Sequence, residues 1–235
     1  MKQSFYLNKE KLENINHDVK IIHIKKCNLW YLCIPTDYKI PKLIENQDSR
    51  GKVVSIDPGV KTFLTMYDQN GSLIKIGKRK ELVYQLYDID KIRSLIATQH
   101  KKKKYNLKRR LAKKLFHLKN CIKEIHYKSC KFLCSHYKTI LIPNIGNIKI
   151  KYSKTQRNLL SWCHSKFIER LKFCGMKHNT YVKIVSEEFT SKTCGHCGWL
   201  NNNLSNKNTF KCSSCNLVLD RDCNGARNIL LKNLK

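Results

Sequence analysis

Four cysteines in two CxxC pairs carry the strongest chemical signal in the chain. Cys194 and Cys197 make up the first pair, Cys212 and Cys215 make up the second, and residues 198–211 separate them. Each CxxC turn can present two thiolates on one side, and a spacer of this length allows a hairpin to bring both turns onto one ion. We therefore predict a zinc ribbon with one structural Zn²⁺. Two chance pairs or two disulfides are the alternative, which the doubled motif and the glycines of CGHCG disfavour.

Carboxylates surround this ribbon in the sequence. Asp57 ends the apolar run VVSID, and Glu187 and Glu188 follow the β-type run at 181–186. Asp222 lies beyond the ribbon, at the start of a last helical segment. Taken singly, Asp57 is typical of an Asp-Pro-Gly turn and Asp222 of a helix N-cap. As an ordered set, they offer the hard oxygen ligands with which two Mg²⁺ ions clamp a phosphodiester during its cleavage.

The charge balance indicates the class of partner. Lysine and arginine number 47 and aspartate and glutamate 17, which gives a formal net charge of +30 and a pI of about 9.8. Nucleic acid is the expected partner, because the sequence has no amphipathic membrane helix, lipidation signal or bilayer-spanning apolar run. The cysteines outside the ribbon have no framework spacing and the N-terminus has no signal core, so we expect a reducing compartment, the nucleus or the cytoplasm.

The apolar pattern predicts a mixed α/β domain around these residues. We expect a strand pair at 19–34, a polar linker at 41–52, and a helical pair at 80–137 that is broken near Tyr105 and Asn106. The other predicted elements are strands 53–57, 61–67, 72–76 and 139–142, helix 156–173, strand 181–186 and helix 224–234. The second and third of these strands join through an Asn-Gly hairpin. A strand meander, helices, further strands and a last helix are the order of a ribonuclease-H-like α/β fold.

Three segments resemble a known family. SIDPGVKTF at 55–63, EEFTSKTCGHCG at 187–198 and DRDCNGARNIL at 220–230 are similar to the RuvC-type nuclease motifs and zinc ribbon of TnpB. The TnpB family consists of transposon-encoded, RNA-guided DNA endonucleases, and within it the chain looks most like the Fanzor branch. The resemblance covers residues 20–235 and combines TSKTC, both CxxC pairs and DRDxNGARNI.

The resemblance implies an RNase H-like (RuvC) nuclease fold with a helical insertion and an inserted zinc ribbon. Residues 1–46 would be the remnant of a wedge-like β region, and residues 47–189 the nuclease core with its helical insertion at 80–137. Residues 190–219 would be the ribbon and residues 220–235 the last segment of the core. Family members carry a large N-terminal region that holds the guide RNA. The short front end here implies a truncated product, or a separate chain that supplies the missing domains.

The resemblance also implies roles for the acidic residues. Asp57 would bridge two catalytic Mg²⁺ ions, and Glu187 and Asp222 would each complete one ion site. Asp220 would either support these ligands without binding an ion or shape the turn. TnpB-like proteins usually place the second carboxylate after the fourth strand, where this chain has Asn144 and no acid. Fanzor-like sequences resemble this one in moving that glutamate to the strand before the ribbon.

We predict that Glu187 rather than Glu188 is this displaced ligand. Glu187 lies two residues before the aromatic residue of the FTSKTC element, and neighbours along a strand face opposite sides. The strand at 181–186 is expected to run beside the strand at 53–57 and to bring Glu187 to Asp57.

A basic stretch without acidic residues lies in the predicted helical insertion. It could be a solvated helix face, but family members contact the guide–target duplex with this insertion, which favours phosphate binding without sequence preference. The cations are Lys101, Lys102, Lys103, Lys104, Lys108, Arg109, Arg110, Lys113 and Lys114. His126 and His164 are expected to be packing residues, because neither has a nucleophile or metal-ligand spacing beside it, and Trp199 is expected in the ribbon core.

Together these features predict an Mg²⁺-dependent, RNA-guided-type DNA endonuclease that uses a two-metal mechanism. Its partners would be DNA and a guide RNA, and its ions one structural zinc and two catalytic magnesium ions. The alternative is a catalytically weak or inactive nucleic-acid-binding remnant of such a nuclease, which relies on the basic helices. A structural zinc-ribbon adaptor would leave the order of the carboxylates unexplained.

Overall fold

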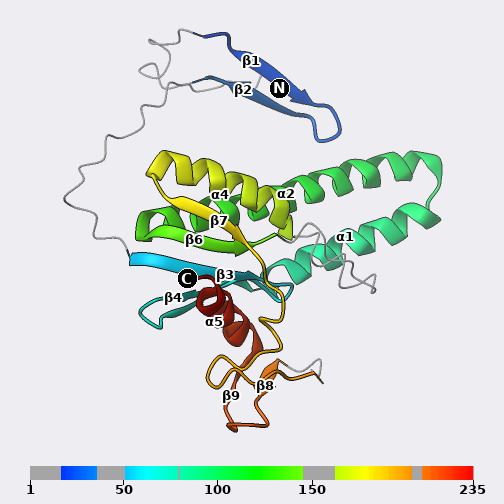
Figure 1. Ribbon diagram of the computed structural model, residues 1–235. Coiled ribbons are helices and arrows are strands. Elements are labelled where there is room, and N and C mark those ends of the chain that lie inside the picture. Colours follow the sequence, from blue (N-terminus) through cyan, green and yellow to red (C-terminus); the bar gives the residue numbers. More distant parts are fainter. Residues whose placement is uncertain (1–16, 36–50, 79, 145–161, 203–207, 235) are drawn as a thin grey trace. The chain divides into compact units, whose positions relative to one another are not determined.

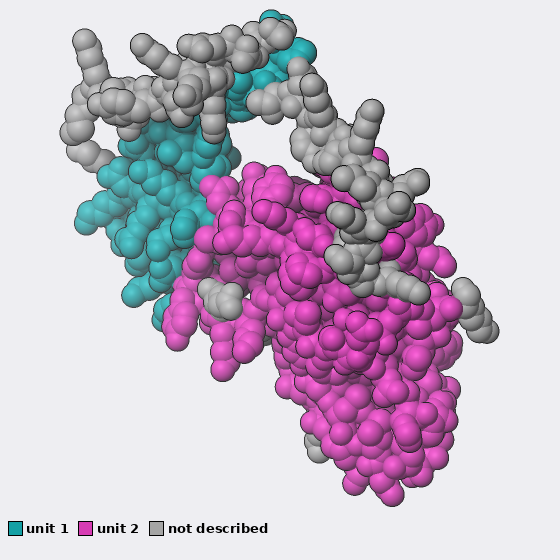
Figure 2. All heavy atoms as spheres, turned by 90° about the vertical axis from the view of Figure 1, so that its left-hand side faces the viewer, with its two compact units in different colours: residues 1–40, 87–117 teal, residues 41–86, 118–235 magenta. Residues whose placement is uncertain are grey.

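The computed structural model describes residues 17–35, 51–78, 80–144, 162–202 and 208–234. The chain divides into two compact units, residues 1–40 with 87–117 and residues 41–86 with 118–235 (Figure 2). The second unit contains the two CxxC pairs and the acidic residues of the predicted site. Within the described ranges, no helix combines the length and the apolar character needed to cross a membrane.

A five-stranded mixed sheet lies at the centre of the second unit (Figure 1). Its strands are β3 (Gly51–Pro58), β4 (Thr62–Asp68), β5 (Leu73–Lys78), β6 (Tyr137–Pro143) and β7 (Tyr181–Val185). They lie in the order β5-β4-β3-β6-β7, with an antiparallel β3-β4-β5 meander and with β6 and β7 parallel to β3. The predicted meander is confirmed.

The predicted neighbourhood of β3 and β7 is wrong. β4 occupies one edge of β3 and β6 occupies the other, so β7 pairs with the remaining edge of β6. β3 begins at Gly51, inside the linker predicted at 41–52, of which residues 41–50 lie outside the described residues.

The turn between β4 and β5 forms as the Asn-Gly pair predicts. Gly71 has a φ of +80°, a left-handed conformation that glycine adopts without a Cβ clash. The Asp68 carboxylate accepts hydrogen bonds from the backbone N–H groups of Asn70 at 2.9 Å and Ser72 at 2.8 Å. This local chemistry fixes the register of the two strands.

Two consecutive helices, α1 (Lys80–Thr98) and α2 (Lys101–His136), occupy the segment that was expected to be helical. The predicted break near Tyr105 and Asn106 is wrong, because the break lies at residues 99–100 and both residues are inside α2. The Lys104 N–H donates to the His100 carbonyl at 3.0 Å, so α2 begins directly before the lysine run. Lysine is a good helix former, and the run therefore continues the helix.

Helices cover both faces of the sheet (Figure 1). α5 (Arg221–Asn233) lies on one face, and α4 (His164–His178) with the second half of α2 lies on the other. Leu230 of α5 belongs to a buried cluster with Leu141 of β6, against which Val53 of β3 packs. Because alternate residues of a strand share a face, Ser55 and Asp57 face α5 as Val53 does. Of the helix predicted at 156–173, residues 156–161 lie outside the described residues.

The ribbon has a small apolar core of its own. β8 (Thr209–Lys211) and β9 (Val218–Asp220) form its antiparallel hairpin. Phe210 is buried with two of the cysteines, and Trp199, Leu217 and Leu219 pack against this cluster. The prediction that Trp199 belongs to the ribbon core is confirmed.

The first unit combines a hairpin with parts of α1 and α2. β1 (Lys20–Ile24) and β2 (Leu29–Cys33) pair antiparallel, as the strand pair predicted at 19–34 requires. The ring of Tyr31 lies 6.0 Å from that of Phe116 on α2. Lys114 of α2 forms an ion pair with Asp88 of α1 at 2.9 Å. These contacts link the three elements of the unit.

Candidate active site and metal centre

The four ribbon cysteines form a compact ligand set. The Sγ atoms of Cys194 and Cys215 are 3.7 Å apart, those of Cys197 and Cys212 are 3.6 Å apart, and all four lie within 4.8 Å of one another. Tetrahedral Zn–S bonds of about 2.3 Å place the sulfurs about 3.8 Å apart. The residues present therefore fit one tetrahedral zinc ion, as the spacing predicts.

The two CxxC turns have the same backbone construction. The Cys194 N–H donates to the Trp199 carbonyl at 2.8 Å, and the Cys212 N–H donates to the Leu217 carbonyl at 2.9 Å. Each turn then reverses through a left-handed residue, Gly198 (φ +78°) in the first and Asn216 in the second. Glycine and asparagine are the residues that adopt this conformation most readily.

The surroundings of the Cys212 sulfur favour the thiolate. Burial opposes ionisation of Cys212, but hydrogen bonds from the backbone of Cys215 and Ser214 lower the pKa of its thiol to about 7. The thiolate is the form that binds a metal ion.

The Asp57 carboxylate lies against the backbone of α5. A Cβ atom on Gly225 would lie 2.5 Å from Asp57 Oδ2, far inside van der Waals contact. Ser55 holds this approach, since its Oγ donates to the Ala226 carbonyl at 2.7 Å. Sequence reasoning missed Ser55 and Gly225. The available signals were a hydroxyl in an apolar strand two residues before Asp57 and a glycine inside a helix.

Three carboxylates interact at the end of β3. Burial, followed by the negative charges of Asp222 and Glu187, raises the pKa of Asp57 to about 8, and Arg221 opposes the shift. Burial also raises the pKa of Glu187. Acids from a strand, a loop and a helix are thus brought into electrostatic contact, although they are far apart in the sequence. Their spacing is wider than that of the sulfurs, because no described carboxylate belongs to a group of three ligand atoms within 4.8 Å.

The two neighbouring glutamates differ in their surroundings. β7 ends at Val185, so Glu187 and Glu188 lie beyond the strand and the argument from strand alternation is wrong. Glu187 is partly buried and acts on Asp57, whereas Glu188 is exposed and is not among the groups that shift the pKa of Asp57. Thr190 fixes the turn by donating its N–H and its hydroxyl to the Glu187 carbonyl at 3.2 and 2.7 Å.

Asp220, rather than Asp222, is the N-cap of α5. Its carboxylate accepts hydrogen bonds from the backbone N–H groups of Asp222 at 3.0 Å and Cys223 at 3.2 Å, and Lys75 of β5 pairs with it at 2.8 Å. α5 therefore starts at Arg221, earlier than the helix predicted from residue 224. Asp222 lies in the first turn of α5, and its side chain does not cap the helix. Asp220 shapes the turn as predicted.

Asn144 lies directly after β6, which ends at Pro143, and it is exposed. The sheet therefore ends next to this position without an acidic side chain. Ile145, the next residue of the block, lies outside the described residues.

Two asparagines join the ribbon to α5. Asn224 accepts from the Gly195 N–H at 3.0 Å and donates to the Thr193 carbonyl at 2.8 Å. Asn228, one helical turn later, donates to the carbonyls of Thr190 at 2.8 Å and Thr193 at 2.6 Å. Both side chains are buried, and sequence reasoning missed them. The helix that carries Asp222 is thereby attached to the first CxxC turn.

The two predicted packing histidines lie against the ring of Phe63. His164 Nε2 lies 3.2 Å from the Gly59 carbonyl, and His126 Nε2 lies 2.8 Å from the Trp162 carbonyl. Both imidazoles stack on Phe63, with ring centroids 5.2 and 5.1 Å away. Burial lowers the pKa of each histidine to about 4, so both are neutral at pH 7. Their predicted structural role is confirmed.

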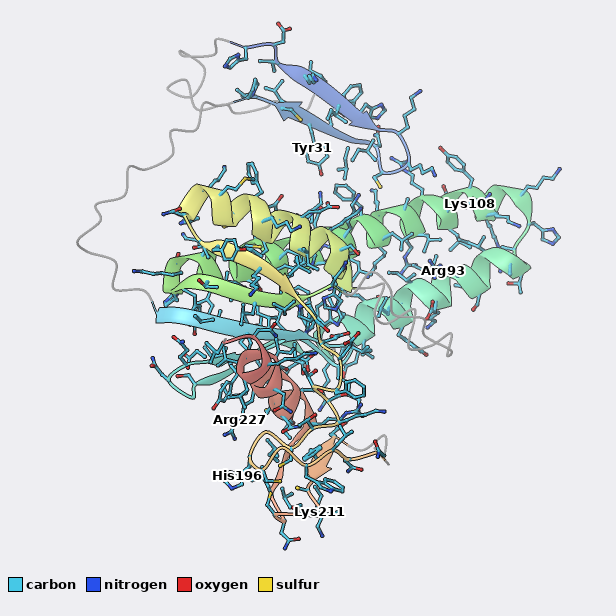
Figure 3. All side chains as sticks on the ribbon, viewed as in Figure 1. Tyr31, Arg93, Lys108, His196, Lys211 and Arg227 are labelled. Atoms are coloured by element: carbon cyan, nitrogen blue, oxygen red, sulfur yellow. The ribbon has the colours of Figure 1, made fainter. Side chains whose placement is uncertain are left out.

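The basic stretch forms the first turns of α2, and most of its described side chains are exposed. Lys114 is paired with Asp88, so it is not a free cation, and the side chain of Lys102 lies outside the described residues. In the first unit, a groove of about 830 Å³ is lined by Lys108 and Arg109 of α2 and by Lys25 of the hairpin turn. Lys108 projects from α2 in Figure 3.

Two models of known protein families match the chain. The family OrfB_IS605, described as "Probable transposase", matches residues 33–157, and the domain described as "Cas12f1-like, TNB domain" matches residues 164–229. The chain belongs to this TnpB-like transposase family.

Relatives of known sequence agree with this assignment. A TnpB-like protein of Acanthamoeba polyphaga mimivirus is 32% identical over 212 residues, which are 83% of this chain and 39% of that protein. A TnpB-like protein of Methanocaldococcus jannaschii is 29% identical over 208 residues, 81% of this chain and 72% of that protein. The CRISPR-associated endodeoxyribonuclease Cas12f1 of an uncultured archaeon is 29% identical over 113 residues, 44% of this chain and 21% of that protein.

A solved structure has a fold similar to that of this chain. A chain of the Cas12f1-sgRNA-target DNA complex matches with a TM-score of 0.60 and 22% identity, covering 90% of this chain and 55% of that chain. The chain spans about two fifths of the length of the mimivirus relative, at 39%.

Proposed function

We propose that this chain is the nuclease core of a TnpB-type, RNA-guided DNA endonuclease, of the Fanzor branch, with a RuvC-type site built from Asp57, Glu187 and Asp222. The observation that carries the proposal is the electrostatic coupling of Asp57 to Asp222 and Glu187. A buried carboxyl next to two further acids is unfavourable in its charged form unless cations are bound there, and such clusters are typical of functional sites.

The fold supports this proposal. The strand order β5-β4-β3-β6-β7, with a helix on each face, is the arrangement expected of an RNase H-like domain. In that reading α1 and α2 form the helical insertion, and the ribbon is inserted between β7 and α5. The acids then lie at the end of the first strand of the sheet, after the last strand, and at the start of the last helix.

Each acid has a distinct part in the proposed reaction. When bound, two Mg²⁺ ions supply an activated water and neutralise the charge that develops on the phosphodiester. Asp57 interacts electrostatically with both other acids, and its carboxylate would help to hold the ions. Asp220 keeps Asp222 in position by capping α5, and Ser55 keeps α5 against β3. The Arg221 side chain adds a positive charge next to the site.

The proposed partners are DNA and a guide RNA. The net charge of +30 and the cations of α2 supply phosphate contacts. The structural neighbour Cas12f1 is solved with an sgRNA and target DNA, which is the same class of partner. A separate chain that supplies guide-binding domains is a further proposed partner. One zinc ion in the ribbon and a reducing compartment, the nucleus or cytoplasm, complete the proposal.

Single substitutions of the acids test the site. Asp57→Asn, Glu187→Gln and Asp222→Asn should each abolish Mg²⁺-dependent cleavage while DNA binding is retained, because an amide oxygen is a much weaker ligand than a carboxylate. Glu188→Gln is the matched control and should leave cleavage unchanged, and Asn144→Ala should be mild. Cleavage that survives Glu187→Gln but not Glu188→Gln would contradict the assignment.

A catalytically inactive, nucleic-acid-binding remnant is the second candidate, and the observation that favours it is the exposed Asn144 directly after β6, where no acid stands. Calorimetric titration of the intact chain with Mn²⁺ distinguishes the two. A nuclease core should bind the ion and lose this binding in Asp57→Asn. A remnant should show no difference between the variant and the wild type.

A further inference from the structure

A strained aromatic residue lies two positions after Glu187. Phe189 has a φ of +64°, a left-handed conformation that bulky residues rarely adopt. Its side chain is 59% exposed, so burial in a core does not compensate for the strain. Among ordinary loop residues this combination is uncommon, and it is found where the backbone is fixed for a function.

The hydrogen bonds of the loop impose the conformation. The Phe189 carbonyl accepts from the backbone N–H groups of Lys192 and Thr193, both at 2.9 Å, and from Thr193 Oγ1 at 2.9 Å. The carbonyl of Thr193 in turn accepts hydrogen bonds from the side chains of Asn224 and Asn228 of α5. The ring is therefore kept at the surface by a loop that is attached both to α5 and to the Glu187 turn.

Phe189 lines an open groove of about 500 Å³ between this loop, the first CxxC turn and the end of α5. Leu231 and Gly198 contribute apolar surface, and Lys232 and His196 contribute polar groups. Glu188 is the acidic residue of the lining, and Lys232 Nζ donates to its backbone carbonyl at 3.2 Å. Figure 3 shows His196 and Arg227 on the same side of the junction between α5 and the ribbon.

We propose that this groove binds an unpaired nucleobase, which stacks on the ring of Phe189, and that it thereby holds a single strand beside the carboxylate site. Every base presents a flat π-face, and an exposed aromatic ring next to cations is the usual platform for single-stranded nucleic acid. A base inside a duplex has no free face, so the occupant is single-stranded. This inference rests on the proposed nuclease function, from which it takes the class of ligand.

The test is a binding experiment with the intact 235-residue chain and a single-stranded DNA that carries one fluorescent adenine analogue. Stacking should quench the analogue, and Phe189→Ala should remove the quenching and weaken binding at least about fivefold. Phe189→Tyr should behave as the wild type does. Tyr84→Ala is the matched control, because Tyr84 of α1 is 81% exposed and does not line this groove, and it should change neither signal.

A second variant separates ligand binding from a structural role. Phe189→Gly should keep or raise the thermal unfolding midpoint, because glycine adopts a positive φ without strain, and it should still lose the quenching. Equal effects of Phe189→Ala and Tyr84→Ala, or a Phe189→Gly variant that unfolds at lower temperature, would overturn the proposal. No divalent ion or cleavage is needed. Failure of the proposed nuclease function would appear instead as absent metal-dependent cleavage with the quenching intact.

Discussion

At the scale of single residues, the environment of Asp57 decides the chemistry of the site. Burial and two like charges raise the pKa of this carboxyl to about 8, so at pH 7 and without ions it holds a proton. A protonated carboxyl is a poor ligand, so binding of the proposed ions would be coupled to loss of this proton. The backbone of α5 next to Oδ2 leaves the carboxylate little freedom to turn away from the other acids.

Gly225→Ala should perturb this arrangement selectively. Alanine is the better helix former by about 1 kcal/mol, so an unhindered site would gain stability. Here the new Cβ would lie 2.5 Å from Asp57 Oδ2, and the expected net effect is a loss of about 1–3 kcal/mol and a large loss of metal-dependent cleavage. Thermal unfolding and a cleavage assay measure both. A variant with raised stability and full activity would show that α5 can move away freely.

The buried histidines should make the stability of the folded protein sensitive to acid. The pKa of His126 and of His164 falls from 6.5 to about 4 on folding, so between these pH values the unfolded chain binds protons that the folded chain does not. Stability should therefore fall as the pH falls from 6.5 to 4, by at most about 1.4 kcal/mol per pH unit for each histidine. The raised pKa of Asp57 acts with the opposite sign over this range. NMR titration isolates the histidines, and imidazole pKa values near 6.5 in the folded protein would contradict this account.

At the scale of elements, the features that depend on neighbouring residues could be predicted from the sequence. The pairing of segments that are distant in the sequence could not. The Asn-Gly71 turn, the apolar strands and the two CxxC turns follow from neighbouring residues. The break at residues 99–100 has no proline or glycine to signal it. The position of β6 between β3 and β7 depends on which sheet edges remain free. The contacts of Asn224 and Asn228 also join segments that are distant in the sequence.

Through Asn224 and Asn228, zinc binding in the ribbon should stabilise α5. Asn224→Ala with Asn228→Ala removes buried hydrogen bonds worth about 1–3 kcal/mol for each unsatisfied partner, yet it leaves the sulfurs in place. We expect one equivalent of zinc in both the wild type and the double variant, with faster amide exchange in α5 of the variant. Chelation of the wild type should loosen α5 in the same way.

Asn233→Ala is the matched control for the asparagine pair, because the Asn233 side chain bonds within α5, to the Ile229 carbonyl. It should leave amide exchange unchanged. Less than half an equivalent of zinc in the wild type, or an α5 that does not respond to chelation, would show that the ribbon and the helix are independent.

At the scale of the whole molecule, charge is the dominant property. With a formal net charge of +30, binding to DNA should be strong at low salt and nearly independent of sequence. Substituting Lys108 and Arg109 together by glutamine should reduce the slope of log affinity against log salt by about 2. Lys128→Gln on the same helix is the control, since Lys128 pairs with Glu124 at 3.2 Å. An unchanged slope in the double variant would exclude α2 from the phosphate contacts.

The hydrogen bond from Ser55 to the Ala226 carbonyl joins residues 171 positions apart in the chain. During synthesis the ribosome releases β3 long before α5, so Asp57 spends that interval without its helix. The proposed catalytic centre is then missing an acid and the backbone that orients another. A nascent chain with a strongly basic surface could bind nucleic acid in this interval but could not cut it. The order of translation would thus delay the proposed cleavage activity until the ribbon and its attached helix have been made.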